Sequence, residues 1–116
     1  MNRIRETLHS PEYDEYYSSL PENVQDKYDY VEDIIRTIRV VNRKFIKRLE
    51  GTDFYEARVS LGSNEYRTIV FSIDADNFME AEQVLLLNSF LKKSSKQYKK
   101  EIRIAEKILN RYKEEE

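Results

Sequence analysis

The sequence predicts a single α+β domain over residues 1–116, with two N-terminal helices packed on a small twisted antiparallel sheet of three or four strands and a C-terminal helix. Two runs of alternating apolar and polar residues, 54–61 and 65–73, flank a Gly-Ser-Asn turn signal, which is typical of a β-hairpin. Apolar stripes at helical spacing lie before this hairpin, at 24–41, and after it, at 96–113. At 14.0 kDa the chain can bury one modest core.

The N-terminal part predicts a short strand followed by a capped helix. Residues 4–8 alternate and are expected to form the strand. Ser10 can cap the helix that follows, Pro11 suits its first position, and acidic residues fill its first turn. Pro21 ends this helix and opens the next one.

The second helix has the clearest pattern in the chain. Its apolar residues recur at spacings of four and three: Val24, Tyr28, Val31, Ile35, Ile38 and Val41. Charged residues fill the opposite face, so the pattern indicates an amphipathic helix of about five turns that packs on a sheet. We expect this helix to end at residues 42–44.

The middle of the chain predicts the sheet. Residues 45–49 form a short connector whose pattern assigns no element, and 50–53 form a turn in which Gly51 can adopt a positive φ. After the hairpin, residues 74–77 make a polar break. Residues 82–89 contain a continuous apolar run, which is typical of a strand buried on both faces, although a short helix gives the same pattern.

The C-terminal part predicts a basic loop at 90–96 and a final helix at 96–113. The apolar stripe of this helix consists of Ile102, Ala105, Ile108, Leu109 and Tyr112. Its other face is basic and carries Lys99, Lys100, Arg103, Lys107 and Arg111. We therefore expect a helix that packs on the sheet and presents cations to solvent.

The net charge of -2 conceals a strong asymmetry along the chain. The first 34 residues hold nine acidic and three basic side chains, whereas residues 92–113 hold nine basic and two acidic ones. Charge separation of this kind can steer a polyanion toward one face of a protein. The distribution therefore suggests an anion-binding face built from the C-terminal part.

Composition excludes several kinds of site. The chain has no cysteine, which rules out a disulfide framework and thiol chemistry, and His9 is its single histidine, so a zinc site of the usual type is not expected. The N-terminus lacks the apolar core of a signal peptide, and no apolar run approaches the roughly 20 residues of a membrane span. We expect a soluble cytoplasmic protein without cofactor or metal.

Charged residues of the hairpin suggest chemistry on RNA. Alternation along the first strand places Glu56 and Arg58 on one face, beside Arg67 of the partner strand. If the next strand is an antiparallel neighbour, the lysines after it lie near one end of the hairpin. A metal-free ribonuclease needs a base for the 2′-OH proton, cations for the phosphorane and an acid for the leaving oxygen. Glu56 could be the base, the two arginines the phosphate clamp, and a lysine or tyrosine the acid.

The same residues also have purely structural interpretations, which compete with a ribonuclease site. Glu56 facing an arginine is more often a salt bridge than a catalytic group, and the lysines at 92–96 and on the last helix are more often a solvated face. Tyr66 and Phe90 are expected to pack in the sheet, and the tyrosines at 13–17 to cover the core. His9 is given no role.

Four segments follow one another along the chain: Lys47-Arg48-Leu49-Glu50-Gly51, Tyr55-Glu56-Ala57-Arg58, Glu65-Tyr66-Arg67-Thr68-Ile69 and Leu86-Leu87-Asn88-Ser89-Phe90-Leu91-Lys92-Lys93. In this order they resemble the motifs "K-x-L-x-G", "Y-E-L-R", "Y-R-[IV]" and "L-x-x-F-x-K-K" of the RelE/HigB family of bacterial toxins. The segment from Lys99 to Ala105 is similar to the family's "P-x-x-E-I-x-x-A" helix. The resemblance covers roughly residues 20–112.

The resemblance implies ribosome-dependent, metal-free cleavage of mRNA in the decoding (30S A) site. It also implies a cognate antitoxin, often a helix-turn-helix protein encoded beside the toxin. Carried over by position, it gives catalytic roles to Glu56, Arg58, Arg67 and Lys93. The expected RNA-binding residues are Lys92, Lys96, Lys99, Lys100 and Arg103.

The sequence departs from the family pattern in two places. Ala57 replaces the usual leucine of the second motif, and Asn88-Ser89 replaces the common His-Gly, so a histidine of some relatives is missing and the general acid is not identified. Two alternatives therefore stay open. The protein could inhibit DNA gyrase without catalysis, as the related ParE toxins do, or it could be an inactive, antitoxin-bound relative.

Overall fold

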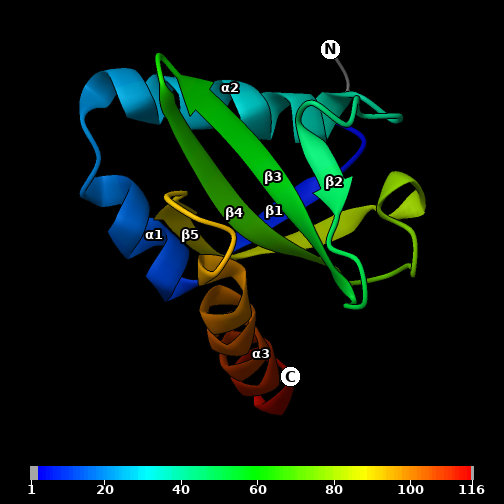
Figure 1. The fold of residues 1–116 in the computed structure, drawn as a ribbon. Helices are drawn as coiled ribbons and strands as arrows, with labels where there is room; N and C mark the ends of the chain where they lie inside the picture. Colours follow the sequence, from blue (N-terminus) through cyan, green and yellow to red (C-terminus); the bar gives the residue numbers. More distant parts are fainter. Residues whose placement is uncertain (1–2, 116) are drawn as a thin grey trace.

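The computed structural model describes residues 3–115, which form three layers. The middle layer is a five-stranded sheet of strand order β1-β5-β4-β3-β2. Helices α1 and α2 cover one face of the sheet, and α3 covers the other (Figure 1). The elements are β1 (Glu6–His9), α1 (Pro11–Ser18), α2 (Glu22–Thr37), β2 (Ile46–Arg48), β3 (Phe54–Leu61), β4 (Asn64–Ser72), the short 3-10 helix η1 (Phe78–Glu80), β5 (Gln83–Leu91) and α3 (Gln97–Glu114). The predicted α+β class is confirmed.

The predicted hairpin is confirmed, with β3 and β4 joined by the two residues Gly62 and Ser63. Gly62 has φ +60° and Ser63 does not have a positive φ, which fits a type II′ turn, whose first central residue favours glycine. Gly51, in the predicted turn before β3, has φ +76°. Both glycines therefore stand where a side chain would strain the backbone.

The sheet is larger than predicted and is not wholly antiparallel. The unassigned connector contains β2, which pairs antiparallel with β3, and β1 pairs parallel with β5. Strands of three and four residues are too short to show a reliable period, which explains why the sequence leaves them uncertain. Strand β5 also runs two residues further than predicted, so Phe90 and Leu91 belong to it and not to the basic loop.

Helix α1 begins as predicted, because the Tyr13 N–H donates to the Ser10 Oγ at 3.0 Å. Helix α2, in contrast, ends at Thr37, before the predicted 42–44. Ile38 is already extended, with φ -108° and ψ 123°. Val41 is nevertheless buried beyond the helix end, so it continues the apolar spacing without being helical. That coincidence made the predicted helix too long.

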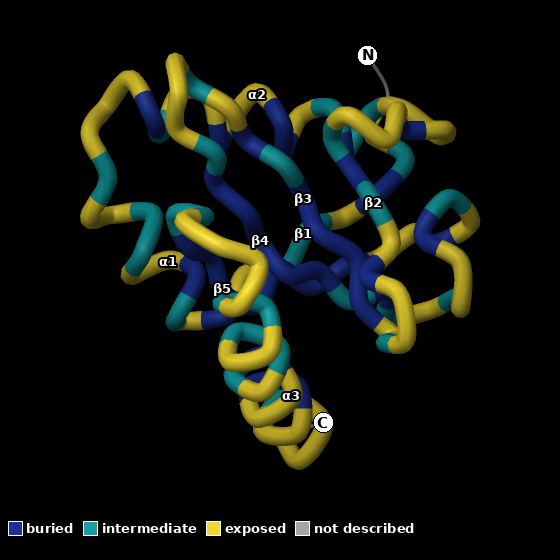
Figure 2. The backbone as a smooth tube through the Cα atoms, in the orientation of Figure 1, coloured by how far each residue is buried: buried dark blue, intermediate teal, exposed yellow. Residues whose placement is uncertain are grey.

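Strands β4 and β5 are buried on both faces, as the tube coloured by burial shows (Figure 2). One core cluster joins α1 and α2 to the sheet, and the other joins α3 to the opposite face. Tyr66 and Phe90 lie in these two cores, as expected. Among residues 3–115, no helix is both long and apolar enough to cross a membrane.

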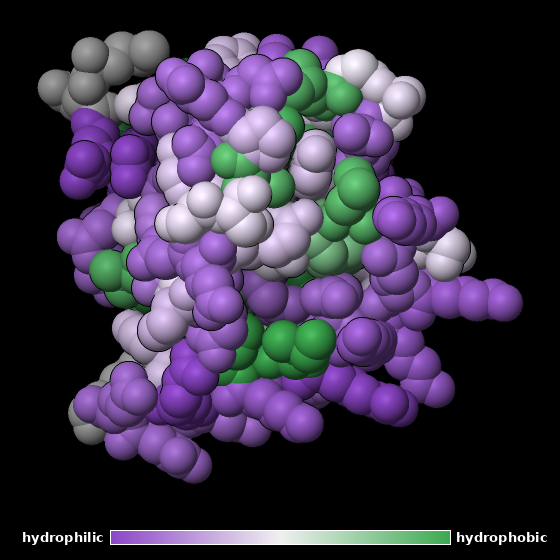
Figure 3. All heavy atoms as spheres, turned by 90° about the vertical axis from the view of Figure 1, so that its left-hand side faces the viewer, coloured by the Kyte–Doolittle hydropathy of each residue, from purple (hydrophilic) through white to green (hydrophobic). Residues whose placement is uncertain are grey.

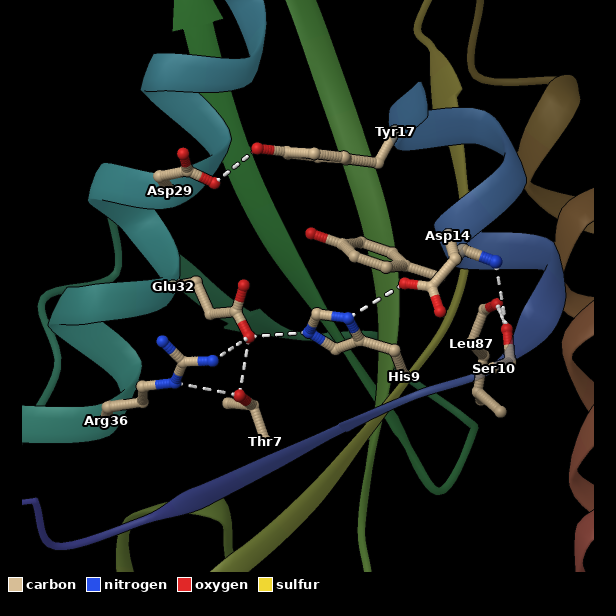
Figure 4. Close-up of polar contacts among 10 residues, drawn as sticks. Thr7, His9, Ser10, Asp14, Tyr17, Asp29, Glu32, Arg36 and Leu87 are labelled. Carbon is tan, nitrogen blue, oxygen red and sulfur yellow. Dashed lines mark hydrogen bonds and ion pairs between the residues drawn. The ribbon is translucent and has the colours of Figure 1, made fainter. Parts of the chain in front are cut away.

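His9 ties three elements together (Figure 4). From the end of β1, its Nδ1 lies 2.9 Å from an Asp14 oxygen of α1, and its Nε2 lies 2.6 Å from a Glu32 oxygen of α2. The same Glu32 oxygen accepts from Thr7 at 2.5 Å and from Arg36 at 2.9 Å. No role for His9 was predicted from the sequence, because its partners Asp14 and Glu32 lie on two other elements.

We expect His9 to make stability depend on pH. The hydrogen bond to Glu32 and the charges of Glu32 and Asp14 raise the pKa of His9 above its ordinary 6.5. A raised folded-state pKa gives stability that is complete below about pH 6.5 and is lost as pH rises through the folded value. Thermal unfolding should show His9→Gln less stable than the parent at about pH 6, with the difference shrinking at about pH 9. A stability difference between His9→Gln and the parent that stays the same at both pH values would contradict this role of His9.

Candidate functional site

The predicted charged residues of the hairpin converge on one face of the sheet. Arg58 of β3 and Arg67 of β4 are directly opposite each other in the strand register, and Glu56 lies two residues before Arg58, on the same face. Oε1 of Glu56 lies 2.9 Å from Nε of Arg67 and 3.3 Å from Nε of Arg58. Opposed like charges destabilise a strand pair, so the Glu56 carboxylate offsets the repulsion between the two guanidinium groups.

Tyr98, in the first turn of α3, completes the cluster. Its hydroxyl donates to the Glu56 Oε1 at 2.9 Å, and its ring stands edge-on to Phe90 with centroids 5.6 Å apart. Burial, and then the nearby Glu56 carboxylate, raise the pKa of Tyr98, so the phenol keeps its proton at neutral pH. Sequence reasoning did not single out Tyr98. Its place one turn before Ile102 puts it on the apolar stripe of the helix, which indicates packing.

Arg67 is a buried structural residue as well as a candidate ligand. Its Nη1 donates to the Tyr66 carbonyl at 3.0 Å, and both Nη atoms lie 3.3 Å from the Glu65 Oε1. The Nε–H is not directed at the nearby Glu56 oxygen, so that contact is an ion pair, and Nε has no hydrogen-bond partner among the described residues. Arg67 is therefore packed within the protein, and a substitution at this position affects the fold as well as any contact with phosphate.

Accessibility differs within the cluster. The side chains of Glu56 and Arg67 are each 5% exposed, whereas that of Arg58 is 29% exposed. A phosphate that approaches the described structure therefore meets Arg58 first. Direct contact with Arg67 requires the surrounding side chains to move, and Tyr98, which donates to Glu56 beside Arg67, is the candidate for that movement.

The basic loop lies beside the hairpin, as predicted. The Lys92 N–H donates to the Glu65 carbonyl at 2.7 Å, and the Lys92 ammonium lies 5.7 Å from the Tyr98 ring centroid. The Gln97 side chain fixes the loop: its Oε1 accepts from the backbone N–H groups of Lys93 and Ser94 at 2.5 and 2.9 Å, and its Nε2 donates to the Leu91 carbonyl at 3.1 Å.

Lys92 is thus the lysine that the fold brings to the cluster, whereas the predicted catalytic Lys93 is exposed. The other predicted RNA-binding residues are also exposed: Lys96, Lys99, Lys100 and Arg103. They continue the cationic surface from the loop along α3. The face on the left of Figure 1 is covered largely by hydrophilic side chains, with small hydrophobic areas between them (Figure 3). Within residues 3–115, no group of three or more acidic or histidine side chains is placed to hold a metal ion.

Comparison with known proteins agrees with this fold. The sequence profile of the family described as "Phage derived protein Gp49-like (DUF891)" matches residues 15–110. Among solved structures, the chain is similar to a free-state variant of the Escherichia coli toxin RelE in which two arginines are replaced by alanine. The TM-score is 0.59 at 14% sequence identity, over 89% of this chain and 97% of that one. No curated protein matches the sequence significantly.

The two matches have different weight. The structural match, at 14% sequence identity, shows that the fold is shared and carries no information about activity. The profile match spans most of the chain and includes every residue of the cluster around Glu56. The resemblance to RelE-like proteins seen in the sequence motifs is thereby confirmed. The chain belongs to the phage-derived Gp49-like family (DUF891) and has the fold of the toxin RelE.

Proposed function

We propose that this protein is the toxin of a type II toxin–antitoxin pair and that it stops translation by cleaving mRNA in the ribosomal decoding site. The observation that carries the proposal is the convergence of Arg58, Arg67 and the Tyr98 hydroxyl on Glu56, beside the Lys92 loop, in a RelE fold. The expected setting is the cytoplasm, with a helix-turn-helix antitoxin as the neutralising partner.

The proposed reaction is a transfer within the RNA that needs no metal. A base takes the proton of a 2′-OH, the freed O2′ forms a bond to the adjacent phosphorus, and the P–O5′ bond breaks. The leaving O5′ takes up a proton, which leaves a 2′,3′-cyclic phosphate and a 5′-OH end. Cations that contact the phosphate oxygens stabilise the charge that builds up in the transition state.

The residues of the cluster suit these steps. Arg58 and Arg67 bind the phosphate, because guanidinium groups contact phosphate oxygens with two parallel hydrogen bonds. Glu56 is the candidate base. Tyr98 is the candidate acid, because its hydroxyl is protonated at neutral pH and lies against Glu56 in the cluster. In this proposal Tyr98 turns away from Glu56 when RNA binds, which exposes both the carboxylate and Arg67.

One observation favours a second candidate, a RelE-like toxin that acts by binding alone. Glu56 is buried and held by two arginines and a tyrosine, which is also what a purely structural salt bridge looks like. Gyrase inhibition of the ParE kind is the specific form of this candidate.

Induction of the protein in cells, followed by mapping of mRNA 5′ ends, separates the two candidates. The nuclease should give cuts at in-frame positions of translated messages, and these should disappear with Arg58→Gln. Growth arrest without such cuts would reject the nuclease. In that case, loss of supercoiling by purified gyrase in the presence of the protein would support the second candidate.

Tyr98→Phe tests the proton donor. The variant keeps the ring against Phe90 and removes only the hydroxyl, so we expect a stable protein whose cleavage on ribosomes falls about 100-fold. Cleavage rates on purified ribosomes, with unfolding curves for the same preparations, give the result. An unchanged rate would show that another group protonates O5′.

A further inference from the structure

The outer edge of β3 is only half covered. Strand β2 pairs with residues 55–57 of β3, and the last bond on this side joins the Arg58 N–H to the Phe45 carbonyl at 2.7 Å. Beyond that bond, β3 continues to Leu61 with β4 on one side and no strand of the described residues on the other (Figure 1). Backbone groups alternate in direction along a strand, so the N–H and C=O of Ser60 point to this open edge.

A groove of about 700 Å³ lies along the open edge, between α2 and the end of β3. Tyr30 of α2 is 55% exposed there, and its ring stands edge-on to Phe45 with centroids 6.1 Å apart. The Lys27 ammonium lies 5.9 Å from the Tyr30 centroid, and that of Lys44 lies 5.6 Å from the Phe45 centroid. The groove thus has an aromatic floor with an ammonium group near each ring.

We infer that this groove binds an extended, acidic segment of a protein partner, which adds a strand to the free edge of β3. The Ser60 backbone supplies strand-pairing hydrogen bonds, and the aromatic floor takes the apolar side chains of alternate residues. Lys27, Lys44 and Arg58 outnumber Asp26 among the charged residues of the lining, which favours carboxylates on the segment.

A nucleic acid fits this groove less well than a peptide. A phosphodiester backbone carries no N–H group, so it cannot form the paired donor and acceptor bonds that a strand makes with the Ser60 backbone. An unpaired strand edge also offers backbone groups that a peptide matches along its length. If the proposed toxin function holds, the antitoxin is the natural source of the segment, but the groove and its test do not depend on that function.

A synthetic peptide of alternating valine and glutamate, about eight residues long, is a suitable probe. In the NMR spectra of the full chain, it should shift the amides of residues 58–61 and the ring signals of Tyr30, and it should slow hydrogen exchange at the Ser60 amide. A peptide with lysine in place of glutamate should cause much smaller shifts. An oligouridylate of similar length is the RNA probe, and its binding at these residues in place of the acidic peptide would overturn the inference.

Three variants, one of them a control, sharpen the test. Lys44→Glu should lower the affinity for the acidic peptide about tenfold. Lys107→Glu, the same change at an exposed position of α3, should leave that affinity unchanged. Ser60→Pro removes the outward N–H, and because that N–H lies outside the β3–β4 ladder, the fold should persist while binding is lost. Equal affinities for all three variants, or peptide-induced shifts that map elsewhere, would refute strand addition at this edge. None of these readouts requires cleavage activity.

Discussion

Replacement of Arg5 by alanine is expected to lower the free energy of unfolding by at least about 3 kcal/mol, a large part of the total for a domain of this size. Arg5 is 1% exposed, and its guanidinium donates only to backbone carbonyls. The acceptors are the carbonyls of Ile35, Ile38, Arg39, Phe78 and Met79, at 2.6 to 3.3 Å. Alanine would leave a cavity and remove one hydrogen-bond donor from each of these carbonyls.

The position of Arg5 explains why the loss should be so large. Its side chain joins the C-terminal end of α2 to the short helix η1, two segments about forty residues apart in sequence. The carbonyls that end a helix have no partner within it, and Arg5 donates to that of Ile35 in the last turn of α2 and to those of Ile38 and Arg39 just beyond it. The guanidinium also lies 4.5 Å from the centroid of the buried Phe78 ring, which adds a cation–π contact.

Two further variants make the Arg5 prediction specific. Arg5→Lys keeps the charge but offers fewer donors in a different geometry, so it should fall between the parent and Arg5→Ala. Arg3→Ala removes an exposed arginine two residues away and should leave stability unchanged within about 0.5 kcal/mol. Denaturant unfolding followed by circular dichroism gives all three values. Equal stabilities for Arg5→Ala and Arg3→Ala would show that the carbonyl cluster contributes nothing.

The sequence predicted the elements that depend on local pattern. The hairpin is visible because its alternation and the Gly62 turn agree, and α2 is visible because its stripe spans four turns. Two features depend on distant contacts and were missed. An arginine near the N-terminus is usually exposed, so the carbonyl cluster around Arg5 leaves no local signal. The end of α2 is masked because the buried Val41 prolongs the spacing.

In the candidate site, too, some features follow from local sequence pattern and others depend on distant contacts. Strand alternation predicts Glu56 and Arg58 on one face beside Arg67; the structure confirms this and pairs Arg58 directly with Arg67. No local pattern, however, shows that α3 brings Tyr98 onto Glu56, nor that Arg67 is covered. The side chains of a site can be predicted from strands that are neighbours in sequence, whereas their accessibility depends on an element that arrives later in the chain.

Arg58→Gln is expected to reduce cleavage on ribosomes about 100-fold while leaving stability nearly unchanged, because Arg58 is partly exposed and binds phosphate in the proposed mechanism. Arg67→Gln should reduce cleavage by a similar factor and also cost about 2 kcal/mol of stability, because Arg67 is buried against Glu56. Arg43→Gln, at an exposed position in the loop before β2, is the matched control and should change neither quantity.

A double variant separates catalysis from packing. Arg67→Gln alone leaves the buried Glu56 carboxylate poorly compensated. Adding Glu56→Gln removes that charge, so the double variant should recover much of the lost stability. If Glu56 and Arg67 act on the RNA, cleavage stays low although the fold is restored, because the base and the phosphate contact are both gone. If the pair serves only to hold β3, β4 and α3 together, cleavage and toxicity should recover with stability. Cleavage that follows stability across these variants would therefore reject a catalytic role for Arg67.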